Sequence, residues 1–282
     1  MEHKIRPNKL LGQNFLTDKS VLKKIIETAD LSPTDTVLEI GPGTGILTKE
    51  LAQKAKRVIA VEKDPKMVEI LREESKGFGN IEIIQGDILK KIKNNELEIK
   101  GYKVVANIPY YLTTNLIRNL LENKNPPKEM VLMLQKEVAE RICANPPDMN
   151  LLAVAVQFYA TAKIIKYVSK KSFWPVPKVD SAIIKITPLI YADSRPIRAD
   201  RKRIDTDKFF RIVKAGFSQP RKQLLNNLSR LNFLSKNYSG QAKSLKNNKE
   251  IIKKWLSRNK INPSQRAETL GIKDWLNLCN NF

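Results

Sequence analysis

The sequence contains few of the residues on which several common kinds of site depend. Its 282 residues include one histidine, His3, and two cysteines, Cys143 and Cys279. We therefore do not expect catalysis by histidine, a metal site of His and Cys ligands, or a disulfide framework. Because unpaired cysteines are typical of reducing compartments, we expect a cytoplasmic protein that holds no metal.

Long apolar runs are also missing. No run approaches the roughly 20 apolar residues of a membrane-spanning helix. The opening MEHKIRPNKL is basic but has no apolar core, which a secretory signal needs. We therefore expect no membrane partner. Nothing in the sequence suggests a coiled coil, and a monomer is the working expectation.

Acidic residues are scarce relative to basic ones. The chain has 51 Lys and Arg against 29 Asp and Glu, a net charge of +22. Residues 191–282 hold 21 of the basic and 7 of the acidic residues, so this third of the chain carries +14 and the rest carries +8. A polyanionic partner, nucleic acid, fits this balance better than a merely solvated surface, because solvated faces mix their signs.

The first 190 residues alternate short β-branched runs with helical patterns. This alternation predicts a doubly wound α/β fold with a mostly parallel sheet. The expected strands are Thr36–Ile40, Val58–Glu62, Ile81–Asp87, Tyr102–Asn107 and Glu129–Gln135, and the expected helices include Val21–Ala29, Ile46–Lys54 and Pro65–Glu74. After Pro188 a charged, proline-containing linker precedes segments of helical spacing only. We predict an α/β domain at 1–190 and a small helical, basic, nucleic-acid-binding domain at 191–282.

A glycine-rich segment, EIGPGTGILT, joins the first of these strands to the next helix. Gly41, Gly43 and Gly45 permit a tight turn and close approach of a ligand to the backbone. Ile46 stands where a dinucleotide-binding fingerprint has its third glycine, and no Gly-Lys-Ser/Thr ending is present. Both NAD and a Walker phosphate loop are therefore disfavoured.

The glycine pattern resembles motif I of class I S-adenosylmethionine-dependent methyltransferases, and the resemblance carries the ligand assignment. Glu62 ends the second strand, 21 residues after Gly41, and a carboxylate there is placed to accept both hydroxyl groups of a ribose. Asp87 is placed to accept a hydrogen bond from the adenine amino group. S-adenosylmethionine is thus the expected cofactor.

The stretch ANIPYYLTTN follows the fourth strand, at the same edge of the sheet. Asn107-Ile108-Pro109-Tyr110 is similar to the motif of enzymes that methylate exocyclic amino groups, in the form used by rRNA adenine N6-methyltransferases. The Asn107 side-chain oxygen and the Pro109 carbonyl could each accept one N6–H of adenine and favour a pyramidal nitrogen. The neutral amine can then attack without a general base, and Tyr110 would stack on the extruded base.

A second aromatic element is FWPVPKVDSAII, in which Phe173 precedes a Pro-Xaa-Pro turn and a strand. It resembles a signature of the same enzymes, whose phenylalanine covers the opposite face of the target base. We expect Phe173 to do so here.

The opening LLGQNFLTD completes a resemblance to the small-subunit rRNA adenine dimethyltransferases, with LQKEVAERI and QRAETL in support. The resemblance covers nearly the whole chain. It implies four methyl transfers to two adjacent adenines of a hairpin loop near the 3′ end of small-subunit rRNA, within an assembling ribosomal subunit. It further implies a set of residues beside the cofactor: Gln13, Asn14, Leu16, Glu39, Lys63, Ile88 and Asn107.

The chain departs from the family pattern at two places. Met149 and Asn150 stand where a Tyr-Gly pair is common, and Pro220 replaces one basic residue of a cluster of which Arg221 and Lys222 remain. Arg221 and Lys222 are the expected RNA contacts. We expect the two departures to affect how the RNA is bound.

Two other functions share these motifs. One is a large-subunit rRNA adenine N6-methyltransferase of the macrolide-resistance type, which Gly12 and the PVPKVDSA form disfavour. The other is a nucleic-acid-binding assembly or transcription factor that keeps the fold but does not need catalytic activity. The intact Asn-Ile-Pro-Tyr stretch and glycine loop argue against it.

Overall fold

The computed structural model describes residues 7–8, 11–191, 204–230 and 245–281. The chain forms two compact units, one of residues 1–143 with 159–192 and one of residues 144–158 with 193–282. Residues 144–158 therefore group with the C-terminal helices, whereas the sequence-based division placed them in the first domain. Their contacts explain the difference, because the Phe158 ring lies 4.4 Å from that of Phe209 and Met149 N–H donates to Glu268 O at 2.9 Å.

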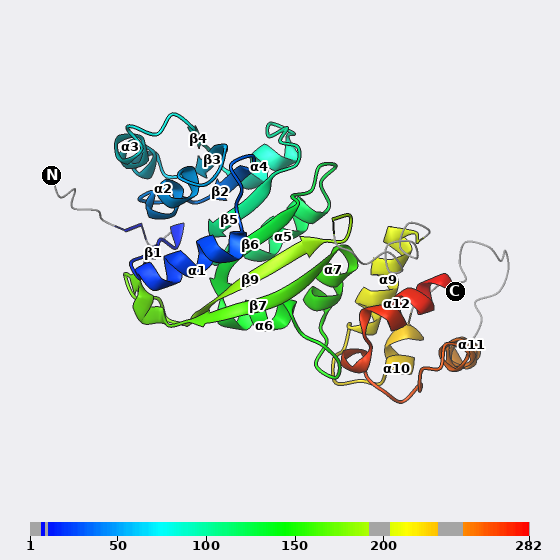
Figure 1. Ribbon diagram of the computed structural model, residues 1–282. Coiled ribbons are helices and arrows are strands. Elements are labelled where there is room, and N and C mark those ends of the chain that lie inside the picture. Colours follow the sequence, from blue (N-terminus) through cyan, green and yellow to red (C-terminus); the bar gives the residue numbers. More distant parts are fainter. Residues whose placement is uncertain (1–6, 9–10, 192–203, 231–244, 282) are drawn as a thin grey trace. The chain divides into compact units, whose positions relative to one another are not determined.

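The N-terminal unit is built on a twisted seven-stranded sheet of order β4-β3-β2-β5-β6-β9-β7 (Figure 1). All neighbouring pairs are parallel except those of β9, which runs antiparallel to both β6 and β7. The strands are β2 (Thr36–Ile40), β3 (Arg57–Glu62), β4 (Ile81–Gln85), β5 (Lys103–Asn107), β6 (Glu129–Gln135), β7 (Ala160–Val168) and β9 (Ser181–Pro188). The predicted doubly wound α/β fold is confirmed.

Helices connect the parallel strands. They are α1 (Lys19–Ala29), α2 (Ile46–Ala52), α3 (Pro65–Glu74), α4 (Ile88–Lys93), α5 (Thr113–Leu121) and α6 (Lys136–Ile142). Successive residues of β2, Val37, Leu38 and Glu39, are all buried. Since neighbouring residues of a strand point to opposite faces, both faces of the sheet are covered. The functional side chains therefore emerge where the strands end.

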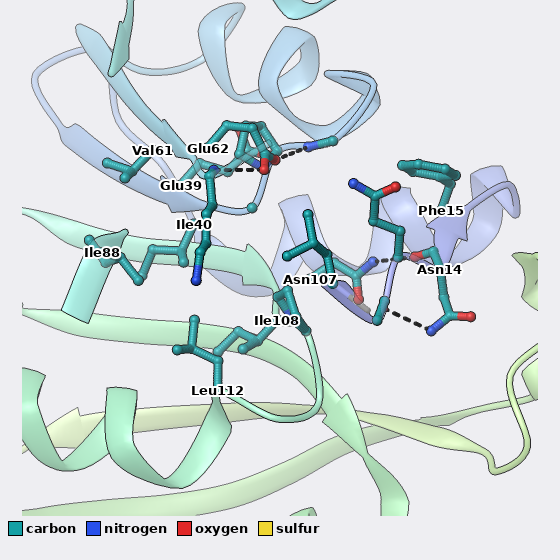
Figure 2. A pocket seen from close by; sticks show the side chains of 18 of the residues that line it. Asn14, Phe15, Glu39, Ile40, Val61, Glu62, Ile88, Asn107, Ile108 and Leu112 are labelled. Atoms are coloured by element: carbon teal, nitrogen blue, oxygen red, sulfur yellow. Dashed lines mark hydrogen bonds between the residues drawn. The ribbon is translucent and has the colours of Figure 1, made fainter. Parts of the chain in front are cut away.

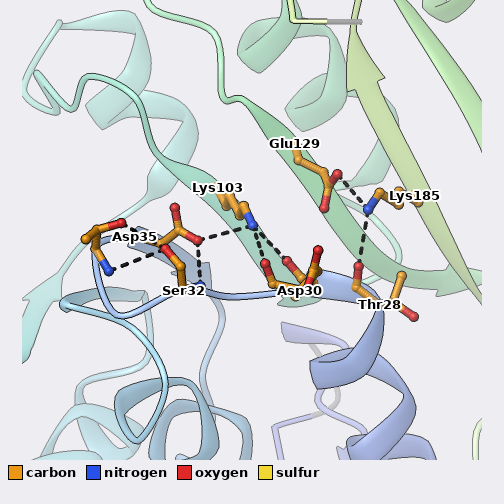
Figure 3. A network of polar contacts seen from close by, with 9 residues as sticks. Thr28, Asp30, Ser32, Asp35, Lys103, Glu129 and Lys185 are labelled. Carbon is orange, nitrogen blue, oxygen red and sulfur yellow. Dashed lines mark hydrogen bonds and ion pairs between the residues drawn. The ribbon is translucent and has the colours of Figure 1, made fainter.

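Two lysines hold the C-terminal end of α1 against the sheet (Figure 3). Lys103 Nζ donates to the Ala29 and Asp30 carbonyls at 3.0 and 2.6 Å and pairs with Asp35 at 3.2 Å. Lys185 Nζ contacts the Thr28 carbonyl at 3.4 Å. Carbonyls at a helix end have no partner within the helix, so these cations satisfy them and fix the helix.

A small second sheet pairs β1 (Phe15–Leu16) with β8 (Phe173–Trp174). At the start of α1, Asp18 accepts hydrogen bonds from Ser20 N and from Ser172 Oγ, at 2.9 and 3.0 Å. The N-terminal segment is thereby attached to the connection between β7 and β9, which includes the short 3-10 helix η2 (Lys170–Ser172).

The C-terminal unit is helical in its described part. Its elements are α7 (Leu151–Tyr159, up to Phe158), α9 (Thr206–Gly216), α10 (Leu224–Leu228), α11 (Leu245–Arg258), the 3-10 helix η4 (Ala267–Thr269) and α12 (Ile272–Asn280). Trp275 is fully buried, and its ring lies so close to Gly216 that a Cβ there would be 2.3 Å from it. This glycine therefore lets α12 approach α9 closely. Across both units, no helix in the described ranges has the length and apolar character needed to cross a membrane.

Candidate functional site

A pocket opens at the carboxyl ends of β2, β3, β4 and β5, between them and the N-terminal segment (Figure 2). Open α/β sheets bind ligands at this edge. The pocket gathers residues that the sequence predicted from six separate segments: Gln13, Asn14, Leu16, Glu39, Gly41, Gly43, Glu62, Lys63, Asp87, Ile88, Asn107, Pro109, Tyr110 and Phe173. Gly45 does not line it. This glycine precedes α2 and faces Leu71, whose Cδ1 lies 2.6 Å from the position of an added Cβ.

The glycine loop is packed closely on both sides. Gly41 and Gly43 have φ angles of +67° and +56°, which residues with a side chain rarely adopt. A Cβ on Gly41 would lie 3.4 Å from Pro109 Cδ, and one on Gly43 would lie 3.1 Å from Phe15 Cε1. The loop thus leaves its backbone exposed to the pocket between the Asn-Ile-Pro-Tyr turn and the N-terminal segment.

Two buried carboxyl groups stand beside this loop. Glu62 Oε1 accepts the Lys63 and Asp64 N–H groups at 2.7 and 2.8 Å, and Oε2 accepts that of Gly43 at 3.2 Å. Burial raises the pKa of Glu62, against the effect of these donors. Burial raises the pKa of Glu39 to about 8, and its Oε2 has no hydrogen-bond partner among the described residues. Glu62 keeps a free lone pair on Oε2 for a ligand hydroxyl group, whereas Glu39 is protonated at neutral pH.

Lys63 and Asp87 form an ion pair between the ends of β3 and β4, with Nζ 3.0 Å from Oδ2. The Asp87 carboxylate also caps α4 by accepting Leu89 N–H at 3.0 Å. Partial burial acts to raise the pKa of Asp87, but the hydrogen bond from Lys63 and the cap outweigh it, so the pKa lies below its usual value. Asp87 is therefore an ionised acceptor, next to Ile88, which is buried against the same part of the pocket.

The Asn107 amide is oriented by the N-terminal segment. Its Nδ2 donates to the Asn14 carbonyl at 3.2 Å, which leaves Oδ1 available as an acceptor. The Pro109 carbonyl accepts Leu112 N–H at 3.0 Å, so one of its two lone pairs remains. Asn107 and Pro109 thus line the pocket with one acceptor each still open, which two N–H groups of one amine would satisfy.

The two predicted aromatic residues line the same pocket but are held differently. The Tyr110 hydroxyl shares a hydrogen bond of 2.9 Å with Ser181 Oγ, and burial raises the pKa of Tyr110. Phe173 is 3% exposed and belongs to the core that includes Leu16 and Val168. Phe173 is therefore a wall of the pocket packed from behind, rather than a ring standing free in solvent.

The N-terminal segment closes one side of the pocket through its own polar contacts. Gln13 Nε2 donates to Asp64 Oδ2 at 2.8 Å, and Gln13 Oε1 accepts Asn8 N–H at 2.7 Å. Asn14 Nδ2 donates to the Gly12 carbonyl at 3.1 Å. The side chains of Gln13 and Asn14 are thus both used to hold the segment in place.

Sequence reasoning missed three residues at this site. Asp64 holds Gln13, Ser181 holds Tyr110, and Tyr111 lines the pocket while remaining 57% exposed. The Asp64-Pro65 pair signals a helix start, and Asp64 does cap α3 by accepting Lys66 N–H. Its contact with Gln13, 51 positions away, has no local signal.

The predicted RNA contacts Arg221 and Lys222 lie in the C-terminal unit, in the turn before α10. Both are exposed. Asn227, which is buried, fixes this turn by donating to the Gly216 and Gln219 carbonyls at 2.6 and 3.0 Å. The two cations thus project from a turn held by a buried amide.

Known proteins resemble this chain over nearly its whole length. The family model of "Ribosomal RNA adenine dimethylase" matches residues 4–282. Proteins named ribosomal RNA small subunit methyltransferase A are 42% identical in Dehalococcoides mccartyi, over 98% of this chain and 88% of the relative, and 44% identical in Clostridium botulinum, over 97% and 93%.

Solved structures agree. A dimethyladenosine transferase from Plasmodium falciparum matches with a TM-score of 0.77 at 30% identity, over 94% of this chain and 95% of that one. The 23S rRNA methyltransferase ErmE matches with a TM-score of 0.71 at 26% identity, over 95% and 99%. Family model, relatives and fold together show that this chain belongs to the ribosomal RNA adenine dimethylase family.

Proposed function

We propose that the protein dimethylates the N6 amino groups of two adjacent adenines in a hairpin loop near the 3′ end of small-subunit rRNA. It would take the methyl groups from S-adenosylmethionine and act as a monomer on an assembling ribosomal subunit. The names of the relatives and the resemblance of the chain to their family support the substrate. The orientation of the Asn107 amide supports the chemistry.

The residues of the pocket fit this cofactor. Gly41 and Gly43 leave room against the backbone, Glu62 Oε2 keeps an acceptor position for a ribose hydroxyl, and Asp87 is an ionised acceptor for an adenine amino group. When bound, the cofactor supplies a methyl group attached to a sulfonium ion. Neutral Glu39 places no second negative charge beside Glu62, which limits repulsion between the two carboxyl groups.

The chain's own part in the reaction is to position the amine. Asn107 Oδ1 and the second lone pair of the Pro109 carbonyl would accept the two N6–H groups, which turns the nitrogen lone pair toward the cofactor side of the pocket. The Asn14 carbonyl prevents the Asn107 amide from presenting its NH₂ group instead. Tyr110 would stack on the base and Phe173 would border its other face, which offsets part of the cost of extruding it.

Replacing Asn107 by Ala tests this assignment. We expect transfer to small subunits to fall about 100-fold or more, because an acceptor that positions the reacting amine is lost. The RNA dissociation constant should change little. Asn115→Ala, at an exposed asparagine of α5, is the matched control. Unchanged transfer by the Asn107 variant would refute the role.

The likeness to ErmE favours one alternative substrate, large-subunit rRNA. Purified small and large subunits, incubated separately with labelled cofactor, decide between the two. Label confined to the large subunit would overturn the proposed substrate. Comparing naked rRNA with partly assembled small subunits then tests the assembly context.

A further inference from the structure

The connection between β7 and β9 carries an exposed surface that the proposed mechanism does not use. Residues 170–179 read KKSFWPVPKV, with three lysines and no acidic residue. Trp174, Val176 and Val179 are among the exposed large apolar side chains, and Lys170, Lys171 and Lys178 are exposed as well. We call the exposed side chains of this stretch the β8 rim: Lys170, Lys171, Trp174, Val176, Lys178 and Val179. Exposed apolar side chains among positively charged ones suit a ligand that has flat apolar faces and negative charge.

Hydrogen bonds hold the β8 rim next to the proposed base site. Asp180 accepts the Lys136 N–H on its carbonyl and the Lys170 N–H on Oδ1, at 3.0 and 2.9 Å. The next residue, Ser181, shares the hydrogen bond with the Tyr110 hydroxyl. The rim and the Asn-Ile-Pro-Tyr turn therefore meet at the start of β9, which brings the rim within reach of a nucleotide next to a base stacked on Tyr110.

Trp174 is presented in a fixed position. The backbone of β8 pairs Phe15 with Trp174 and Leu16 with Phe173. Phe173 faces the pocket and the core, whereas Trp174 is 49% exposed. The Trp174 ring lies 6.3 Å from that of Phe15 at an interplanar angle of 21°. A ring already ordered by a neighbouring ring loses little conformational entropy when it binds a ligand.

We propose that the β8 rim binds the unpaired nucleotide next to the methylated adenine, with its base stacked on Trp174 and the adjoining phosphates near Lys170, Lys171 and Lys178. The proposal rests on the proposed function, because it assigns a second contact to the same RNA. RNA suits the rim better than a protein partner does, because every base has a π-face for stacking and every nucleotide brings a phosphate.

Tryptophan fluorescence gives a readout independent of methylation. The chain has three tryptophans, and Trp255 and Trp275 are only 7% and 0% exposed. Titration with a short single-stranded oligoadenylate should therefore quench chiefly Trp174 emission, and Trp174→Phe should lose most of the quenching. Equal quenching in the variant would place the contact elsewhere and overturn the proposal.

Kinetics separate stacking from a purely structural role of the ring. Trp174→Leu keeps an apolar cover over Phe15 but has no aromatic face, whereas Trp174→Tyr keeps one. We expect Trp174→Leu to raise KM for small subunits about tenfold, with kcat and the cofactor dissociation constant nearly unchanged, and Trp174→Tyr to stay within about threefold of wild type. Equal KM values for the Leu variant and wild type would refute the stacking.

The lysines are tested by salt dependence. The double variant Lys170→Gln/Lys171→Gln should lower the slope of log affinity against log salt by about one to two. Lys54→Gln, at an exposed lysine after α2, is the matched control. A slope equal to that of the control would refute phosphate binding at the rim. Should wild-type protein fail to methylate small subunits, the proposed function fails, while quenching still tests the rim.

Discussion

Glu39 predicts a specific dependence of stability on pH. Its pKa rises from 4.5 to about 8 on folding because the carboxyl group is buried. Between these values the folded protein holds a proton that the unfolded chain has released. The contribution of Glu39 to stability is thus fully present below pH 4.5 and is lost as the pH rises through about 8. The loss amounts to roughly 1.4 kcal/mol per pH unit, and on the order of 5 kcal/mol in total.

Glu39→Gln removes this titration and keeps the size of the side chain. We expect the free energy of unfolding of the wild type to fall relative to that of the variant by about 4 kcal/mol between about pH 5 and about pH 8. Urea denaturation followed by circular dichroism at constant ionic strength measures both curves. Other groups, including Glu62 with its raised pKa, titrate in both proteins, so the difference between the two curves is assigned to Glu39. Parallel curves would show that Glu39 is ionised in the folded protein and would refute the reasoning.

Three further substitutions test the packing that supports the site. Gly216→Ala should destabilise the C-terminal unit by about 2 kcal/mol or more, because its Cβ would clash with the Trp275 ring. Thermal unfolding followed by tryptophan fluorescence measures the loss of stability, and an unchanged midpoint would contradict the prediction. Lys103→Met should lower the free energy of unfolding by about 3 kcal/mol in a urea titration, since Asp35 and the α1 carbonyls lose their cation. An equal loss in a Lys54→Gln control would contradict this role of Lys103. Asn227→Ala should weaken RNA binding several-fold in filter binding while leaving cofactor affinity unchanged, because the turn it fixes carries the predicted RNA contacts; full RNA affinity would show that the turn does not need its buried amide.

The sequence predicted the parallel half of the sheet well because buried β-branched runs and glycine turns are local signals. The observed end of a strand differs from the predicted one where a side chain caps the following helix instead of continuing the strand. The strand expected to reach Asp87 ends at Gln85, because Asp87 caps α4. Residues 151–158, which lie within the predicted first domain, group with the C-terminal helices, because LLAVAVQFY is almost wholly apolar and such a pattern does not tell which core a helix joins.

The site was predicted as a set of residues but not as a set of contacts. Motif spacing placed Glu62, Asp87 and Asn107 at strand ends, and parallel strands bring such ends to one edge. It could not show that Glu62 already accepts three backbone N–H groups or that Asn107 is turned by the Asn14 carbonyl. Those facts depend on loops whose positions are set by long-range packing.

The N-terminal segment explains why residues so distant in sequence act as one site. Along four successive residues it contacts three parts of the unit: Asn14 binds the Asn107 amide, Phe15 packs on Gly43 and on Trp174, Leu16 pairs with Phe173, and Thr17 N–H donates to the Ser172 carbonyl at 2.9 Å. The glycine loop, the amine-positioning turn and the β8 rim are thus attached to a single strand of backbone. A displacement of this segment would therefore alter the cofactor side and the base side of the pocket together.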